Sequence, residues 1–321
     1  ASADYSIAQG YQANALTLNA TAIGNQANAS GASALAVGSF AKASGNTANA
    51  FGFNSSASGC VSLAVGHWAS ATGDYSSAIG RAAFTSGRNS LAVGDAAGAL
   101  GNFSVAVGEA VNASGKSSIA IGNGSIAINV SSVALGALAN ASGVFSIAHG
   151  YRANASGYEA LALGNASTAS KTGAIALGSL ANATGDFSIA QGRLASASDE
   201  ASVAIGYLAN ASGCVSLAIG RFTQASGVNA LALVENANAS GEGGIAIGNN
   251  ANAKGYYSTA IVSASSASGN YSMALGPAAN ASGYASIAQG LFSNATGNYS
   301  IAIGNASNAA GLQSIAQGVR A

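Results

Sequence analysis

Large and small residues alternate along this chain in short stretches that return at a fixed interval. Residues 118–122 read Ser-Ile-Ala-Ile-Gly, in which two isoleucines flank a single alanine. We number the repeat so that Ser6 is position 1; this position recurs every 14 residues up to Ser314, without insertion or deletion, which gives 23 copies. Alternation with period two is typical of a β-strand, whose successive side chains point to opposite faces. Each copy therefore predicts a short strand over positions 1–5.

The remainder of each repeat predicts a second strand and two turns. Positions 8–11, typically Ala-Asn-Ala-Ser, alternate again. Glycine fills position 5 in 21 of 23 copies and position 12 in 18 of 22, and we expect position 12 to open a turn that uses positive φ. One repeat is then one coil, and successive coils stack as parallel strands about 4.8 Å apart. The predicted fold is an all-β, parallel β-solenoid, or β-roll, of 14-residue coils.

The interior of such a coil is narrow, so only small side chains fit. Alanine fills position 3 in all 23 copies and position 10 in 21 of 22, and we predict that both line the interior together with position 8. Positions 2, 4 and 14 then share the outward face. The reverse arrangement, with the isoleucines inside, is the alternative. It fits less well, because position 4 tolerates Phe51 and His149 whereas position 3 accepts only alanine.

The outward face forms an apolar stripe, which predicts burial between chains. Positions 2 and 4 together hold 37 aliphatic or aromatic residues. Full burial of one large apolar side chain contributes about 1.5–3 kcal/mol, so a stripe of this length favours association. The residues that represent this predicted oligomer interface are Ile7, Leu35, Leu63, Val105, Ile119, Ile121, Ile147, Ile189, Ile205, Ile245, Ile287, Ile301 and Ile303.

With these residues in view, the repeat resembles the head domain of trimeric autotransporter adhesins, the YadA-like head. That family's 14-residue signature appears here as "SVAIGYLANASG" at 202–213 and "SIAIGNASNAAG" at 300–311. The resemblance covers essentially the whole chain. It implies a left-handed β-roll, a homotrimer with the stripe at its centre, an extracellular, cell-surface location and adhesion to a host or matrix surface component. A self-assembling filament or sheath subunit that stacks end to end, with no receptor, is the alternative function. An ice-binding solenoid fits less well, because position 11 is mostly serine where such a surface needs threonine.

Polar residues interrupt position 4 of the stripe in five copies. Around a threefold axis, each would form a ring of three facing side chains that fixes the register of the chains, as one buried asparagine does in coiled coils, or that holds water or an anion. The alternative is a hydrated widening with no specific ligand. These residues are Gln9, His149, Gln191, Gln289 and Gln317.

The 321 residues predict one solenoid array rather than several globular domains. The recurrence of polar residues at position 4 suggests a ten-coil duplication, with units 6–145 and 146–285 followed by 286–321. Charged residues make up 6% and the formal net charge is zero, so we expect no nucleic-acid partner. No apolar run reaches 18 residues, so no membrane span is predicted. The chain begins and ends inside the repeat and has no visible signal peptide, so we expect a fragment or a unit that abuts a copy of itself.

Asparagine fills position 9 in 12 of 22 copies, on the outward side of the second strand. In nine copies Ser or Thr follows two residues later, which makes these asparagines candidate N-glycosylation sites. The alternative is a ladder of asparagines hydrogen-bonded between coils, as in stacked β-structures. The nine candidates are Asn28, Asn112, Asn140, Asn154, Asn182, Asn210, Asn238, Asn280 and Asn294.

Side chains that support catalysis or metal binding are few and scattered. Cys60 and Cys214 both occupy position 13, eleven coils and roughly 50 Å apart, so they cannot pair within one straight chain. Free thiols at a turn are expected, with inter-chain bonding as the alternative. Acidic residues such as Asp74 and Asp186 fall in turns. Because no nucleophile–base pair or metal cluster can be located, we predict a protein that is not an enzyme and has no cofactor.

Overall fold

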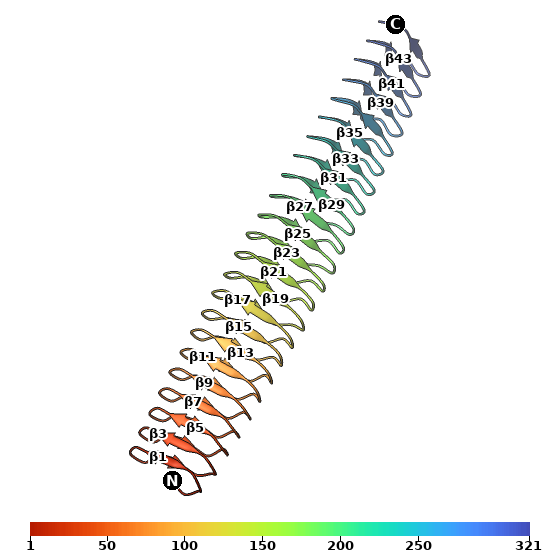
Figure 1. The fold of residues 1–321 in the computed structure, drawn as a ribbon. Coiled ribbons are helices and arrows are strands. Elements are labelled where there is room, and N and C mark those ends of the chain that lie inside the picture. The colour runs from red at the N-terminus through yellow and green to blue at the C-terminus, as the bar shows by residue number, and fades with distance from the viewer. The chain divides into compact units, whose positions relative to one another are not determined.

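The computed structural model describes all 321 residues and contains only strands and turns. The chain divides into two compact units, Ala1–Glu159 and Ala160–Ala321. In both units each repeat is one coil, made of a three-residue strand, a turn, a two-residue strand and a second turn (Figure 1). The predicted parallel β-solenoid with a 14-residue period is confirmed.

The first unit holds the strands of the first eleven coils. Its three-residue strands cover positions 2–4 and are β1 (Ile7–Gln9), β3 (Thr21–Ile23), β5 (Leu35–Val37), β7 (Asn49–Phe51), β9 (Leu63–Val65), β11 (Ser77–Ile79), β13 (Leu91–Val93), β15 (Val105–Val107), β17 (Ile119–Ile121), β19 (Val133–Leu135) and β21 (Ile147–His149). Its two-residue strands cover positions 9 and 10 and are β2 (Asn14–Ala15), β4 (Asn28–Ala29), β6 (Lys42–Ala43), β8 (Ser56–Ala57), β10 (Ser70–Ala71), β12 (Phe84–Thr85), β14 (Gly98–Ala99), β16 (Asn112–Ala113), β18 (Ile126–Ala127), β20 (Asn140–Ala141) and β22 (Asn154–Ala155).

The second unit repeats the same alternation. Its three-residue strands are β23 (Leu161–Leu163), β25 (Ile175–Leu177), β27 (Ile189–Gln191), β29 (Val203–Ile205), β31 (Leu217–Ile219), β33 (Leu231–Leu233), β35 (Ile245–Ile247), β37 (Thr259–Ile261), β39 (Met273–Leu275), β41 (Ile287–Gln289), β43 (Ile301–Ile303) and β45 (Ile315–Gln317). Its two-residue strands are β24 (Thr168–Ala169), β26 (Asn182–Ala183), β28 (Ser196–Ala197), β30 (Asn210–Ala211), β32 (Gln224–Ala225), β34 (Asn238–Ala239), β36 (Asn252–Ala253), β38 (Ser266–Ala267), β40 (Asn280–Ala281), β42 (Asn294–Ala295) and β44 (Asn308–Ala309).

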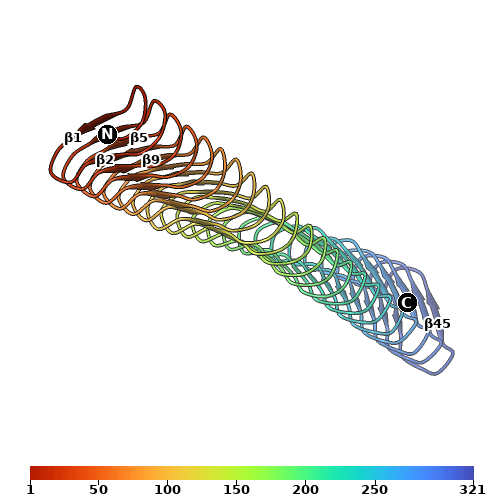
Figure 2. The ribbon, with the colours of Figure 1, turned by 90° about the horizontal axis from the view of Figure 1, so that it is seen from below.

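Two parallel ladders hold the coils of each unit together. Within each unit, strands pair with the strand one coil away, and residues that are 14 apart face each other, as Ile119 faces Val133 in β17 and β19. The turns are hydrogen-bonded between coils as well. The amide of Tyr75 donates to the carbonyl of Cys60 at 2.8 Å, and the amide of Trp68 donates to that of Phe53 at 3.0 Å. In the view of Figure 2 each repeat is accordingly one open loop stacked on the next.

Alanine lines the interior, as predicted. Position 3 is fully buried, with Ala120 and Ala134 at 0% exposure, and so is position 10, for example Ala113. Position 1 also points inward, where a serine hydroxyl such as that of Ser118 donates to the carbonyl of Gly115 at 2.7 Å. Because the alanines are inside and positions 2 and 4 reach the surface, the reverse arrangement of the two faces is wrong.

Three local expectations about the turns are wrong. The second strand covers only positions 9 and 10 instead of 8–11. Position 14 does not share the strand face of positions 2 and 4, because it is a turn residue in the left-handed region, with φ of 57° at Tyr75 and 61° at Phe103. Glycine at position 12 does not use positive φ. A Cβ on Gly45 would lie 2.0 Å from the carbonyl oxygen of Gly59, so close approach of successive coils selects glycine there.

Candidate self-association face

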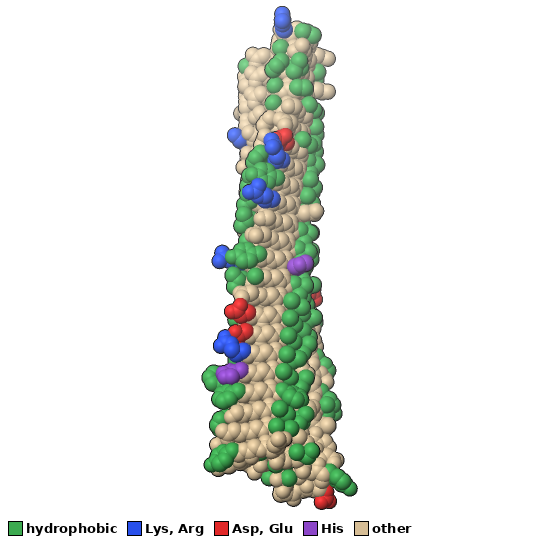
Figure 3. Space-filling model, turned by 60° about the vertical axis from the view of Figure 1, so that its left-hand side comes forward, with side chains coloured by type: hydrophobic (Ala, Val, Ile, Leu, Met, Phe, Trp, Pro, Cys, Tyr) green, Lys and Arg blue, Asp and Glu red, His purple; other side chains and the backbone are tan.

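The outward side of the three-residue strands carries the predicted stripe. Because the ladders are in register, position 2 forms one row through Val105, Ile119 and Val133, and position 4 forms a parallel row beside it. Figure 3 shows hydrophobic side chains gathered in such a stripe beside a broad surface of backbone and uncharged, non-hydrophobic side chains. The stripe is therefore a surface of the single chain rather than part of its core.

The side chains of the stripe keep part of their surface in water. Neighbouring coils cover only their flanks, so Ile121 and Ile147 are each 40% exposed. Ile7 lies in the first coil, with a neighbour on one side only, and is 56% exposed. The other predicted interface residues are half-buried: Leu35, Leu63, Val105, Ile119, Ile189, Ile205, Ile245, Ile287, Ile301 and Ile303. An apolar face of this length that stays partly exposed in the single chain is a candidate interaction site.

Polar side chains interrupt the stripe where the sequence places them. His149 lies beside Leu135, and Gln191 lies between Leu177 and Ile205 in the ladder. All five residues of this set are exposed in the single chain: Gln9, His149, Gln191, Gln289 and Gln317. Each is therefore free to contact a partner at the stripe.

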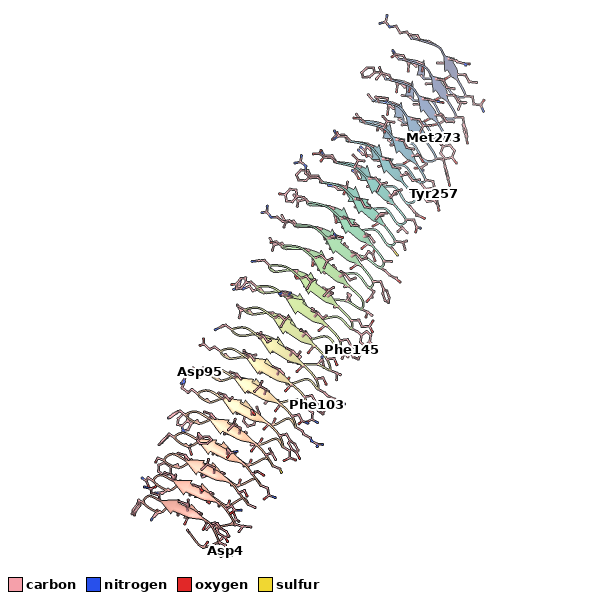
Figure 4. The ribbon with its side chains drawn as sticks, in the orientation of Figure 1. Asp4, Asp95, Phe103, Phe145, Tyr257 and Met273 are labelled. Carbon is pink, nitrogen blue, oxygen red and sulfur yellow. The ribbon has the colours of Figure 1, made fainter.

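The turns on either side of the stripe carry exposed aromatic side chains. Figure 4 labels Phe103 and Phe145 on the edge that precedes the three-residue strands, and Asp95 on the opposite edge of the same unit. In the second unit, neighbouring tyrosines form a chain of edge-on contacts with ring centroids 5.4–5.6 Å apart, from Tyr271 through Tyr284 to Tyr299. Sequence reasoning did not anticipate these edges, because left-handed turns usually signal themselves by glycine or asparagine.

Charged groups are sparse and lie in the turns. Arg81 pairs with Asp95 one coil away, and Arg221 pairs with Glu235 in the same relation. The hydrogen bond that Arg81 donates to the carboxylate of Asp95, together with the negative charge of Asp95, raises the pKa of Arg81 above its ordinary value. Turn carboxylates also cap backbone amides; the carboxylate of Asp74 accepts from the amide of Cys60 at 2.9 Å. No three His, Cys, Asp or Glu side chains are grouped closely enough to bind a metal ion.

The second sheet presents the asparagine face. The side-chain amide of Asn140 donates to the side-chain oxygen of Asn154 at 3.2 Å, and Asn280, Asn294 and Asn308 form the same contact in series at 2.9 and 3.1 Å. The nine candidate glycosylation asparagines are all half-buried in this face. Both cysteines, in turns, are free thiols.

The best-defined hollow on the surface lies at the beginning of this asparagine face. It has a volume of about 430 Å³, and its lining includes Gln12, Gln26 and Lys42. Its other lining residues are Asn14, Asn28 and Phe40. Amides and one lysine supply hydrogen bonds but no nucleophile–base pair, so the hollow gives no basis for catalysis.

Fold and surface define a repetitive β-solenoid with a partly exposed apolar face. The chain belongs to the YadA head domain family. The YadA head domain repeat (2 copies) matches residues 1–27, 18–41, 29–55, 62–83, 86–108, 113–137, 127–153, 155–181, 183–213, 216–233, 239–261, 267–293 and 295–321. The structure is thus of the kind found in heads of trimeric autotransporter adhesins rather than of a known enzyme family. A comparison with curated proteins finds no match. The structure contains no helix that is long and apolar enough to cross a membrane.

Proposed function

We propose that this chain is the head region of an extracellular, surface-displayed adhesin that works as a homotrimer. Three copies would run parallel, with the apolar stripes facing a common axis. The observation that carries the proposal is the stripe itself: two in-register rows of aliphatic side chains, such as Ile119 and Ile121, stay partly exposed in the single chain. Family membership supplies the adhesin class.

The remaining exposure gives the magnitude of the drive to associate. Full burial of an isoleucine contributes about 1.5–3 kcal/mol, so the 40% of Ile121 still in water represents about 0.6–1.2 kcal/mol. Summed over the 37 apolar residues at positions 2 and 4, even a smaller average contribution amounts to tens of kcal/mol per chain. Association of the stripes is therefore the expected state of the protein in water.

The asparagine face would lie on the outside of such a trimer and display the surface that meets a partner. Its ladder of hydrogen-bonded amides, as between Asn280 and Asn294, is polar, uncharged and regular. An adhesive surface of this composition recognises its partner by hydrogen bonds and shape, with little contribution from long-range electrostatics. The partner belongs to the components of a host or matrix surface.

Two measurements test the proposal. Light scattering of the purified chain should give a mass of three times 30.5 kDa; a monomer or dimer contradicts the trimer. Immobilised host cells or matrix proteins should retain the trimer. Interrupting the asparagine face by Asn280→Ala with Asn294→Ala should weaken retention without changing the trimeric state. Electron microscopy separates the competing function: particles of one fixed length support a head, and fibres of unlimited length support a filament subunit.

A further inference from the structure

The two turn edges of the solenoid match each other in a way that the single chain does not explain. Positions 13 and 14 precede each three-residue strand and form what we call the leading edge. Positions 6 and 7 follow the same strand and form the trailing edge. In Figure 4, Phe103 lies on the leading edge and Asp95 on the trailing edge. The sheet separates the two edges, so their side chains do not meet within one chain.

Side-chain sizes on the two edges are complementary around the same strand. Position 14 is aromatic in eight coils, and in five of them position 7 is alanine. Position 14 is Ser, Gly or Ala in seven coils, and in five of them position 7 is Leu or Phe. The pairs are Tyr75 with Ala82, Phe103 with Ala110, Tyr257 with Ala264, Tyr271 with Ala278, Tyr299 with Ala306, Ser33 with Phe40, Ser131 with Leu138, Gly173 with Leu180, Ala201 with Leu208, and Ala285 with Phe292.

These side chains are held outward. Positions 7 and 14 are left-handed turn residues throughout, for example with φ of 61° at Phe103 and 58° at Leu138. A left-handed conformation costs a residue other than glycine about 1–2 kcal/mol. Most of the large members remain exposed, at 53% for Phe103 and 62% for Phe292, whereas Phe40 and Leu208 are half-buried. Hydrogen bonds between coils hold these turns in place, and the exposed aromatic surface indicates a site of interaction with another molecule.

Charges on the two edges are complementary as well. In three coils both position 13 and position 6 are charged, and in all three the signs are opposite. A shift of one coil in either direction weakens this pattern, because it places Asp74 opposite Asp95, or Arg88 opposite Arg81, alongside two pairs of opposite sign. The three pairs are Asp74 with Arg81, Arg88 with Asp95, and Asp186 with Arg193.

The same shift weakens the size match. With the leading edge moved by one coil against the trailing edge, Tyr75 would face Trp68 and Tyr299 would face Phe292. Moved in the other direction, Tyr271 would face Phe292, and four of the eight aromatic side chains would face alanine or glycine, against five when the edges are level. With the edges level, no aromatic side chain faces another. The level alignment is therefore the one that both size and charge select.

We infer that the leading edge of one copy packs against the trailing edge of the next copy, coil level with coil, and that this seam sets the axial register of the assembly. The inference rests on the proposed trimer, in which a cyclic arrangement brings unlike edges of neighbouring copies together. The stripe sets register only weakly, since a slip of one coil replaces isoleucine by valine or leucine. The seam supplies the penalty for slipping, as repulsion and clash do in other specific interfaces.

Cross-linking tests the seam directly. In a Cys60→Ser, Cys214→Ser background, Phe103→Cys with Ala110→Cys places thiols on both edges of one level, and a short bismaleimide should convert the chains to covalent trimers. The matched control, Phe103→Cys with Ala82→Cys, is offset by two coils, or about 10 Å, and should stay unlinked. A trimer by light scattering in which the offset pair links as fast as the level pair overturns the seam alone. A monomer overturns the proposed function as well.

A size swap gives a second readout. Ala110→Phe should lower the melting temperature of the trimer by placing phenylalanine against Phe103 of a neighbour, and Phe103→Ala should lower it by leaving a gap. The double variant should recover more than half of the loss from Ala110→Phe. Because residues 103 and 110 lie on opposite edges of one chain, coupling between them must pass between copies. Additive shifts in a protein that remains trimeric contradict the seam.

Discussion

Acidic residues placed in the stripe test the association face most sharply. Ile119 and Ile121 lie in one strand, β17, and point outward together, with Ile121 40% exposed. Replacing both by aspartate removes about 1–2 kcal/mol of apolar burial per chain on association, scaled from the exposed fraction. It also places six carboxylates around one axis in a trimer. An unpaired carboxylate in a desolvated site costs several kcal/mol, so the charge term exceeds the apolar term.

The expected result is therefore a trimer that melts at lower temperature and opens at this coil at pH 7. Burial and like charges raise the pKa of the new carboxyls in the trimer above the ordinary value of about 3.9. A group whose pKa is raised in the assembled state supports that state below its free pKa and opposes it as pH rises. Stability of the variant trimer should accordingly recover at pH 3.5 relative to pH 7.

The same coil offers a matched control. Ile126 and Ile128 are exposed on the other side of the solenoid, at 38% and 43%. Ile126→Asp with Ile128→Asp removes two isoleucines of similar exposure and adds the same charge, yet should leave the mass and the melting temperature close to those of the parent. Light scattering and thermal melts at both pH values make the comparison. The reasoning fails if substitution of Ile126 and Ile128 disrupts association as much as substitution of Ile119 and Ile121, or if the latter has no effect.

Three further outcomes are expected. Ala120→Leu overfills the alanine interior and should cost about 1–3 kcal/mol or more, whereas Ala139→Val should be tolerated because Val111 already occupies the same position at 2% exposure; thermal melts compare the two. Burial, followed by the charge of Glu242, raises the pKa of Tyr256 above its ordinary value. The neutral phenol therefore supports the fold up to about pH 10, and this support is lost as pH rises through the raised pKa. In an ultraviolet titration, Tyr256 of the Glu242→Gln variant should ionise at a lower pH than in the parent. The third measurement is the intact mass of protein produced in a glycosylating host. A mass above that of the polypeptide would assign glycans to the asparagine face. A mass equal to that of the polypeptide would mean that these asparagines form only the hydrogen-bonded ladder.

The ladder register and the identity of the lining followed from the repeat itself. A strict 14-residue period without insertion allows only one pairing, residue with residue 14 away, and position 3 accepts only alanine because the two strands of a coil lie too close for more. The outward direction of Ile119 and Ile121 then follows from the alternation of side chains along a strand. All of this rests on local patterns, which a sequence displays directly.

The turns were decided by the tertiary structure. Nothing local to Phe103 predicts a left-handed residue, since that conformation is disfavoured for a phenylalanine in isolation; it is stabilised by the amide of Phe103 donating to Arg88 one coil away at 2.8 Å. Gly45 is likewise selected by the carbonyl of Gly59 in the next coil. The sequence alone determined the coil, its lining and its apolar face, because these depend on spacing within a repeat. Only the stacked structure determined the turn edges, because their conformation depends on hydrogen bonds between residues 15 apart and on close contacts between residues 14 apart.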